Sequence, residues 1–428
     1  MKNLDTNLYS RQIRTYGLET MLKLQNLRIL IVGMRGLGTE IAKNLILSGV
    51  KEIQILDENI CEINELGSNF FISEKNIGER RDNSCLQKLK ELNSYVSVDI
   101  FKGKLYESIL DFDVVVITEI MNPDLLFKLD EKCHENNISF IYCLNLGLSC
   151  FIFSDFGKKH IITDPTGKEK KSYFIKSIDK SGIITIDEAN RDEFTLNTGD
   201  FVKFKEVKGI EELNDGKPRK INFLSKNSFS IDEKYNFENY KVGGIIEEVV
   251  FPEEKNYYKF KDRFYIPYLE ENSPDINDFT KNSRNELLHL SFLAIHEYYK
   301  EKNEFPEIND LEEGQKILEK AKIIYDKAKN NKEFWINNIE YLDQQIILNA
   351  IRWSKCQISP ICSFMGGIAA QEVIKKTGKY LPINQYLWFD FFETIEFLNG
   401  NINRDIFGSR NDDQISIYGQ KIQKKLND

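Results

Sequence analysis

A glycine-rich stretch follows an apolar run near the start of the chain. The apolar run ends at Val32 and leads into Gly33, Gly36 and Gly38, and Asp57 ends the next apolar run. Glycines let the backbone approach a phosphate, free N–H groups at a helix start favour an anion, and a carboxylate in the place of Asp57 can accept hydrogen bonds from a ribose. The spacing is Gly-x-x-Gly-x-Gly, not the Gly-x-Gly-x-x-Gly of dinucleotide sites. Two interpretations stay open, a nucleotide site and a glycine turn that packs a helix against a strand.

The cysteine and histidine residues do not indicate a thiol nucleophile or a metal site. The chain has seven cysteines, an odd number, and no two of them form a Cys-x-x-Cys pair. We therefore expect reduced thiols that serve as small buried hydrophobic residues. None of them is nominated as a nucleophile. His289 and His296 lie on one expected helix with no carboxylate or cysteine beside them, which is typical of packing or surface residues rather than of metal ligands. We expect no metal site.

Composition narrows the class of protein. The 428 residues include 58 basic and 67 acidic ones, for a net charge of −9. Because phosphate binding needs a basic footprint, this balance argues against nucleic acid as a partner. No stretch reaches the roughly 18 apolar residues that a membrane span needs, so we expect no membrane partner. We expect a protein of the cytoplasm and nucleus with about two to four domains.

Residues 1–150 alternate between apolar stretches that predict strands and segments with the period of a helix. The expected strands cover 28–33, 53–56, 96–100, 114–117 and 140–142. Continuous apolar strands that alternate with helices indicate a mainly parallel sheet covered on both faces. The glycine loop and Asp57 would then follow the first two strands.

The pattern changes twice further along the chain. From about 168 to 252, short β-rich stretches separated by turn signals such as 214–216 predict a compact antiparallel module. From about 275 to 355, apolar residues spaced by three or four predict three helices in a small bundle, the third of them over 335–346. These apolar stripes are expected to face a core and to take no part in chemistry.

A return to the first domain is expected after the bundle. Small residues in the helix predicted over 361–374 would permit close packing against a neighbouring helix or sheet. Residues 385–392 then predict a buried strand that could rejoin the first sheet. Both modules would in that case interrupt one α/β domain.

An internal repeat links the two ends of the chain. Residues 12–17 read Gln-Ile-Arg-Thr-Tyr-Gly and residues 414–419 read Gln-Ile-Ser-Ile-Tyr-Gly, each followed five residues later by Lys-Leu. Arg11 and Arg410 stand just upstream. A nucleotide-fold strand follows the first copy, so we expect a second α/β domain to follow the other copy and the chain to be a fragment.

Five short motifs together resemble the adenylating domain shared by ubiquitin-like-protein activating enzymes and bacterial sulfur-carrier adenylating enzymes. They lie at 9–13, 33–38, 56–57, 76–78 and 91–94. The β module and the bundle are similar to the two inserts in the first half of the ubiquitin-activating enzymes. Residues 197–202 and 242–245 are especially similar to the first catalytic-cysteine half-domain of that family.

The resemblance implies an α/β fold, a Rossmann-like adenylation domain of the sulfur-carrier-adenylating type, with an inserted antiparallel β half-domain and an inserted helical bundle. The expected segments are 1–167 and 356–405 for an inactive adenylation domain, 168–254 for the β half-domain, 255–355 for the bundle, and 406–428 for the start of a truncated second adenylation domain.

The sequence departs from active members of that family where they bind phosphate and metal. Those members carry Asn-Leu-Asn-Arg-Gln-Phe where residues 65–70 here read Glu-Leu-Gly-Ser-Asn-Phe, with Gly67 and Ser68 in place of the asparagine and arginine. Neither residue can hold a phosphate as an arginine fork does. The aspartate-rich turn for magnesium is also missing after 114–117, where no aspartate occurs until Asp124 and Glu119 stands in a different position.

The departures predict a non-catalytic pseudo-domain with a vestigial nucleotide loop. This loop comprises the three glycines, Asp57 and Arg81, the last of which stands where the family has a lysine. The resemblance also implies that Arg11 reaches across to the ATP of the other half, a task that suits a rigid guanidinium. The alternative for Arg11 is an ordinary surface arginine on an amino-terminal helix.

The resemblance implies an activity for the complete enzyme only. That enzyme would use ATP and Mg²⁺ to adenylate the carboxyl end of ubiquitin and pass it to a cysteine thiol, expected beyond Asp428, as a thioester. This chain alone is expected to be inactive and to bind neither cofactor tightly. Its implied partners are ubiquitin, contacted through 168–252, the carboxy-terminal half of the same polypeptide and, through the complete enzyme, ubiquitin-conjugating enzymes.

Three alternatives remain. The chain could be a subunit of an activating enzyme for SUMO or another modifier, although the repeat at 409–426 and the β insert argue against it. It could be an NAD-dependent oxidoreductase that uses Gly33 to Asp57, against which the glycine spacing and the lack of a catalytic histidine or tyrosine constellation argue. It could be a scaffold that binds a modifier without enzymatic activity.

Overall fold

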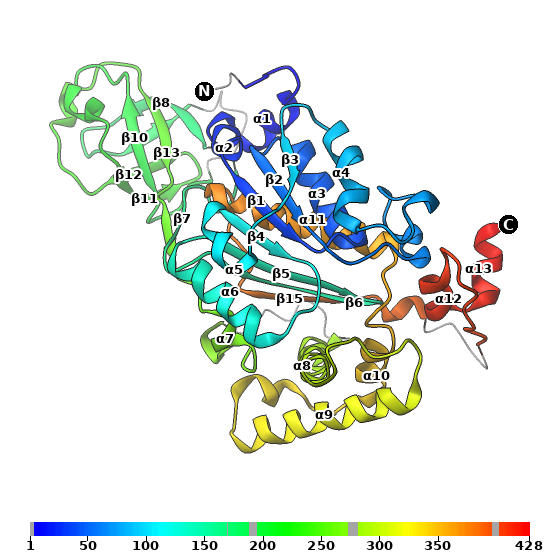
Figure 1. Cartoon of the computed structure of the whole chain (residues 1–428). Helices are drawn as coiled ribbons and strands as arrows, with labels where there is room; N and C mark the ends of the chain where they lie inside the picture. Colours follow the sequence, from blue (N-terminus) through cyan, green and yellow to red (C-terminus); the bar gives the residue numbers. More distant parts are fainter. Residues whose placement is uncertain (1–3, 169, 188–194, 273–280, 396–401) are drawn as a thin grey trace. The chain divides into compact units, whose positions relative to one another are not determined.

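The computed structural model describes residues 4–168, 170–187, 195–272, 281–395 and 402–428 (Figure 1). The chain divides into two compact units. The first comprises Met1–Ile161 and Glu254–Asp428, and the second comprises Ile162–Glu253. The sequence predicted a β module over 168–254. Within the described residues, no helix combines the length and the apolar character needed to cross a bilayer.

A seven-stranded mixed sheet organises the first unit, in the order β15-β6-β5-β4-β1-β2-β3. The strands β1 to β5 pair in parallel, while β6 runs antiparallel to β5 and β15 antiparallel to β6. Their bounds are Arg28–Val32 for β1, Glu52–Leu56 for β2, Ser97–Ile100 for β3, Val114–Ile117 for β4, Ser139–Leu146 for β5, Ser149–Asp155 for β6 and Tyr386–Asp390 for β15. The strand predicted over 385–392 thus lies in the same sheet as the first five.

Alternate side chains of each central strand enter different cores. In β1, Ile29 and Ile31 join the core on one face of the sheet, whereas Leu30 and Val32 join the core on the other face. The first core also takes side chains from α2 (Leu18–Leu24), α3 (Gly36–Ser48), α4 (Arg81–Glu91) and α11 (Ser359–Ile374). The second takes them from α6 (Pro123–Glu135), α7 (Phe260–Arg263) and α8 (Arg284–Lys302). Burial on both faces explains why these strands read as continuous apolar runs.

The helical insert differs from its prediction in one element. Here α8 packs against α9 (Leu311–Asn330) and α10 (Gln344–Arg352). The single helix predicted over 335–346 is wrong, because this stretch contains a 3₁₀ turn, Phe334–Asn338, and only the first residues of α10. The carboxylate of Asp343 accepts hydrogen bonds from the N–H groups of Gln345 and Ile346 and so starts a new helix there.

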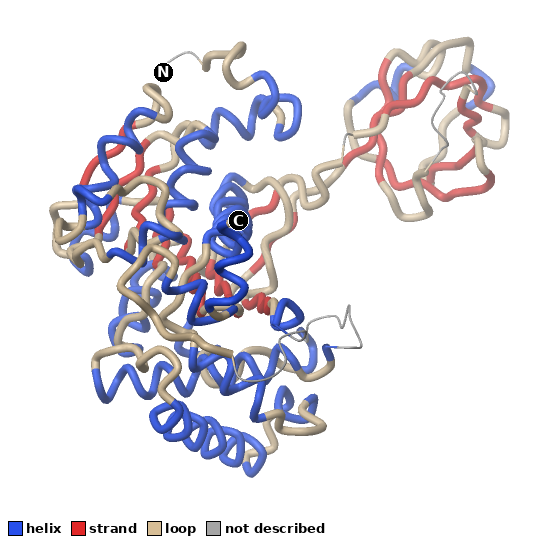
Figure 2. The backbone as a smooth tube through the Cα atoms, turned by 90° about the vertical axis from the view of Figure 1, so that its right-hand side faces the viewer, coloured by secondary structure: helices blue, strands red, loops and turns tan. Residues whose placement is uncertain are grey.

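The second unit is a closed six-stranded antiparallel barrel, seen as a ring of strands in Figure 2. Its strands are β8 (Ser172–Ile178), β9 (Ile184–Ile186), β10 (Phe201–Lys205), β11 (Arg219–Ser225), β12 (Ser228–Ile231) and β13 (Ile245–Val249). Buried residues such as Val202, Phe204, Ile221 and Phe229 fill its interior. A two-stranded sheet of β7 (His160–Ile162) and β14 (Glu253–Lys255) lies where the chain passes between the units.

The repeated sequence forms the same local structure twice. Helix α1 (Ser10–Tyr16) and helix α2 meet at Gly17, with φ 85° and ψ 156°. Helix α12 (Asp412–Tyr418) and helix α13 (Gln420–Asn427) meet at Gly419, with φ 83° and ψ 162°. Each glycine donates its N–H to the isoleucine carbonyl four residues earlier. A positive φ of this kind favours glycine, so the repeat encodes one supersecondary unit.

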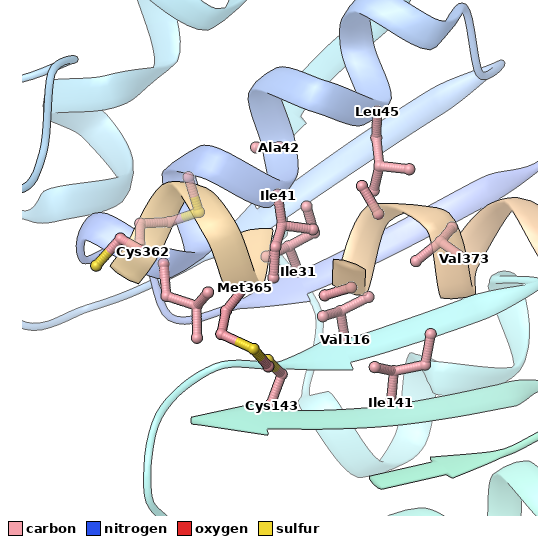
Figure 3. Close-up of a cluster of buried hydrophobic side chains, with 14 of the residues drawn as sticks. Ile31, Ile41, Ala42, Leu45, Val116, Ile141, Cys143, Cys362, Met365 and Val373 are labelled. Carbon is pink, nitrogen blue, oxygen red and sulfur yellow. The ribbon is translucent and has the colours of Figure 1, made fainter. Parts of the chain in front are cut away.

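Helix α11 lies against α3 on one face of the sheet (Figure 3). Met365 and Val373 of α11 and Ile41 and Leu45 of α3 are buried there together. A Cβ added to Gly366 would lie 2.6 Å from Cβ of Glu40. The small residue therefore permits the close approach of the two helices.

We expect Gly366→Ala to destabilise the first unit and Gly367→Ala to stabilise it slightly. Both changes favour helix by up to about 1 kcal/mol, but only the first forces α3 and α11 apart, which costs about 1–3 kcal/mol. A Cβ on Gly367 meets no atom within 4 Å, so this variant is the matched control. Urea unfolding should place the two variants about 2 kcal/mol apart. Equal stability would contradict the proposed packing constraint.

Candidate functional site

The glycine loop joins β1 to α3 and is shaped by close contacts within the protein. Gly33 has a φ of 94°. A Cβ on Gly38 would lie 1.9 Å from the carbonyl oxygen of Gly33, and a Cβ on Gly36 would lie 2.8 Å from Oγ of Ser68. Packing alone therefore requires glycine at these positions, whether or not a ligand binds.

The carboxylate of Asp57, which follows β2, is occupied by groups of the protein. It accepts the N–H of Met34 at 2.8 Å and the N–H of Asn59 at 3.0 Å. Nη1 of Arg81 lies 3.2 Å from Oδ1 of Asp57. Asp57 is 1% exposed. Both carboxylate oxygens have protein donors where a ribose hydroxyl would donate in a nucleotide site.

Arg81 opens α4 and bridges two buried carboxylates. Its Nε donates to Glu65 at 2.9 Å and its Nη2 lies 2.6 Å from Oε1 of Glu65. Burial alone would lower the pKa of Arg81, but the hydrogen bonds and negative charge of Glu65 and Asp57 outweigh it and raise that pKa. The guanidinium is thus used inside the protein instead of being presented to a phosphate.

Oxygen atoms from two segments that are distant in sequence lie near the start of α3. Oε1 of Gln357 accepts the N–H of Leu37 at 3.3 Å. The backbone N–H of Gln357 in turn donates to Oδ2 of Asp413 at 2.7 Å. Nη2 of Arg35 lies 3.9 Å from the same Asp413 oxygen, and its Nε lies 3.4 Å from Oε1 of Glu65. The chain therefore surrounds its own glycine loop with acceptors.

Glu119, which follows β4, also lies at this loop. Its Cβ and Cγ would be 3.3 Å from a Cβ on Gly33, and Nδ2 of Asn59 donates to its carboxylate at 3.4 Å. Burial, together with the negative charge of Asp57, raises the pKa of Glu119 to about 7. Asp124, the next acidic residue along the chain, pairs with Lys300 instead, at 3.1 Å.

The balance of charge at the loop is unfavourable for a nucleotide. Two guanidinium groups, of Arg35 and Arg81, stand among four carboxyl groups, those of Asp57, Glu65, Glu119 and Asp413. A triphosphate would add negative charge to this excess. Within the described residues no cluster of three or more histidine, cysteine, aspartate or glutamate side chains could hold a metal ion.

Gly67 and Ser68 lie in and beside a 3₁₀ turn, Ile63–Gly67, that faces the second copy of the repeat. A Cβ on Gly67 would lie 2.3 Å from the carbonyl oxygen of Arg410. Nη2 of Arg410 donates to the carbonyl of Leu66 at 2.8 Å. The position at which active relatives were expected to carry a phosphate-binding side chain is therefore in contact with backbone.

The structure does not bring Arg11 to this loop. Tyr9, which precedes α1, packs against Gly49 at the opposite end of α3, and its hydroxyl accepts a hydrogen bond from Asn93 at 2.9 Å. Arg11 is exposed, and α1 buries none of its residues. Within the described part of the chain, no ion pair involves Arg11.

Cysteines and histidines are packed into the interior, away from solvent. All seven cysteines are buried, and burial raises the pKa of Cys85 and Cys362 to about 12, so these thiols are poor nucleophiles at neutral pH. His296 shares a 2.8 Å hydrogen bond with the hydroxyl of Tyr142. Burial lowers the pKa of His289 to about 3.

Arg35, Gln357 and Asp413 belong to this site but were not predicted from the sequence, and no role was predicted for Glu65. Arg35 lies within the glycine motif itself, so the sequence already indicated that it belongs to the loop. Aligning the two copies of the repeat on Gln12 and Gln414 sets Asp413 opposite Arg11. This alignment could have indicated Asp413 from the sequence, because it pairs Asp413 with Arg11, a candidate site residue.

A family model described as the ThiF family matches residues 9–404. The chain belongs to the ThiF family. It is 35% identical over 432 residues to "Ubiquitin-activating enzyme E1 1" of Candida albicans, covering 99% of this chain and 41% of that protein. It is also 35% identical to "Ubiquitin-like modifier-activating enzyme 1" of Homo sapiens, covering 99% of this chain and 40% of that protein.

This ThiF-family chain thus spans about 40% of the length of those relatives. Among solved structures, Escherichia coli MccB with succinimide matches with a TM-score of 0.31 and 22% identity, over 34% of this chain and 47% of that one. So partial an overlap adds nothing to the family assignment.

We expect Glu119→Gln to remove a pH dependence of stability. Because folding raises the pKa of Glu119 from 4.5 to about 7, the proton favours the folded state. This contribution is complete below pH 4.5 and is lost as the pH rises through 7. At pH 8 the variant should exceed the wild type by up to about 3 kcal/mol, and at pH 4.5 the two should be similar.

Urea unfolding at the two pH values measures this difference. Glu62→Gln, which changes an exposed carboxylate nearby, is the control and should follow the wild type. If Glu119→Gln and Glu62→Gln have the same pH profile, Glu119 is not held in a desolvated, negatively charged site.

Proposed function

We propose that this chain is the amino-terminal part of an ATP-dependent ubiquitin-activating enzyme. The complete enzyme adenylates the carboxyl end of ubiquitin and then transfers it to a cysteine thiol as a thioester. Two observations support the proposal: the ThiF-family match over most of the chain, and the full-length similarity to ubiquitin-activating enzymes of which the chain covers about 40%. Activation of SUMO or another modifier is the alternative within the family.

In this proposal the half described here is a non-catalytic adenylation domain. The observation that carries this assignment is the filled glycine loop, in which Asp57 and Arg81 are bound to each other and to Glu65. Adenylation needs fixed positive charge on the phosphates. Here that charge is already neutralised. The same occupied Asp57 disfavours an NAD-dependent oxidoreductase, which would need this carboxylate for a ribose.

The catalytic ATP site, its Mg²⁺ and the thiol nucleophile belong to the carboxy-terminal half in this proposal. ATP supplies the activated phosphorus that the ubiquitin carboxylate attacks. The half described here offers a rigid sheet and a barrel whose outer surface contacts ubiquitin. Ubiquitin-conjugating enzymes engage the complete enzyme, in the cytoplasm and nucleus.

We further propose that Arg11 acts on the ATP site of the other half. The two copies of the repeat support this proposal. Helix α12 buries five of its seven residues against the first domain and brings Asp413 to a glycine loop, whereas its counterpart α1 buries none. If a second domain receives α1 as the first receives α12, Arg11 reaches the second glycine loop in the place that Asp413 occupies at the first. A guanidinium there would pair with phosphate oxygens.

This chain alone should give no ubiquitin-dependent ATP–pyrophosphate exchange above a protein-free blank, because the guanidinium of Arg81 at its loop is already paired with Asp57 and Glu65. The complete enzyme, assayed beside it, should exchange readily and serves as the positive control. Robust exchange by the chain alone would refute its assignment as a non-catalytic domain.

In the complete enzyme, Arg11→Ala should slow adenylation on the order of 100-fold, the usual cost of losing one donor to developing charge. Single-turnover formation of ubiquitin adenylate measures the effect. Arg14→Ala removes another exposed arginine from α1 and should leave the rate unchanged. Equal rates for the two variants would remove Arg11 from the ATP site.

A further inference from the structure

Two helix ends and the guanidinium of Arg35 lie at the first glycine loop, among the carboxyl groups described above. The start of α3 presents backbone N–H groups and the positive end of a 13-residue helix. Arg35 lies beside this helix start, immediately before Gly36. A second helix, α11, begins within two residues of Gln357, and no side chain caps it. Positive potential from two helices and a guanidinium therefore meets in one place.

Asp413 lies in that place and is almost fully buried, with 3% of its surface exposed. Its Oδ2 accepts the N–H of Gln357 at 2.7 Å, and its Oδ1 accepts Nδ2 of Asn64 at 3.0 Å. Nη2 of Arg35 lies 3.9 Å away. A buried carboxylate needs such donors, since an unpaired one would cost several kcal/mol.

One further polar group lies at the start of α3. Oγ of Ser68 is buried and has no hydrogen-bond partner within the described residues. It lies 2.8 Å from where a Cβ on Gly36 would stand, at the start of α3. A surface pocket of about 620 Å³ adjoins Ser68 and is also lined by Lys75, Ser359 and Arg410. Ser68 therefore lies between this pocket and the start of α3.

The structure points to a retained oxyanion site at the first glycine loop, in which the carboxylate of Asp413 is the resident ligand. The second copy of the repeat thus supplies, from within the chain, the negative charge that a phosphate would supply in a working nucleotide site. Gly67 belongs to the same arrangement, because any side chain there would collide with the carbonyl of Arg410 and displace the segment that carries Asp413. This inference does not depend on the activity proposed above.

Helix α12 has other anchors that keep it in place without Asp413. Ile417 is fully buried, and Nε1 of Trp353 donates to the carbonyl of Ser416 at 2.9 Å. Removing the Asp413 side chain should therefore vacate the anion site while the fold persists. An added oxyanion should then take its place and restore stability.

The test is chemical rescue of Asp413→Ala in the 428-residue chain. The variant should melt about 3–6 °C below the wild type in sodium chloride, because buried donors lose their acceptor. Sodium sulfate at matched ionic strength should recover at least half of that loss along a saturable curve. In wild type and in Asp405→Ala, which removes an exposed aspartate from the same segment, sulfate should give only a small shift linear in concentration.

Two further variants locate the effect. Asp413→Asn keeps an oxygen in the cleft without the charge, so it should melt lower than the wild type and show no saturable response to sulfate. Adding Arg35→Gln to Asp413→Ala should abolish the rescue. If Asp413→Ala melts with the wild type, or if sulfate stabilises it no more than Asp405→Ala, the proposal is overturned. If Asp413→Ala does not fold, a saturable sulfate response of Asp413→Asn would equally overturn it.

Discussion

The ion pair network of Arg81 with Asp57 and Glu65 decides the character of the glycine loop. A guanidinium and two carboxylates taken out of water are stable only while they neutralise one another and their hydrogen bonds are complete. This network occupies both the carboxylate of Asp57, which a ribose would need, and the guanidinium of Arg81, which a phosphate would need. In the proposed non-catalytic domain, the lack of nucleotide binding would therefore be an electrostatic property of the whole loop and would not rest on Gly67 and Ser68 alone.

Close packing of α3 and α11 makes one domain of segments that are far apart in sequence. Because Gly366 allows the two helices to touch, the segment after the bundle shares the core of the first three strands, and β15 extends the same sheet. The returning segment also carries Gln357, whose amide oxygen accepts the N–H of Leu37. The packing of α3 against α11 thus also places the Gln357 side chain at the glycine loop.

The repeat shows how one local structure serves two purposes. Both copies fold into two short helices around a glycine with the same backbone angles. One copy buries most of its first helix and places a carboxylate against the domain, while the first helix of the other copy has no buried residue and presents an arginine. The copies differ at several positions, among them Arg11 against Asp413 and Thr15 against the buried Ile417, and in what each helix pair contacts. A duplicated unit can in this way hold a charge for its own domain in one copy and offer the opposite charge outward in the other.

The sequence by itself determined the first five strands, the glycine turn, the helix of small residues and the repeat, because period, glycine placement and apolar runs are local properties. It missed β6, which continues the apolar run of β5 across a turn at Gly147, and it merged a 3₁₀ turn with α10 because apolar spacing carried across Asp343. Only the tertiary structure decided the state of the site. Asn64 and Asp413 are 349 residues apart, and whether a carboxylate is free or paired depends on such partners. Local sequence cannot specify them, since the desolvation and pairing of charge are set by the packed fold.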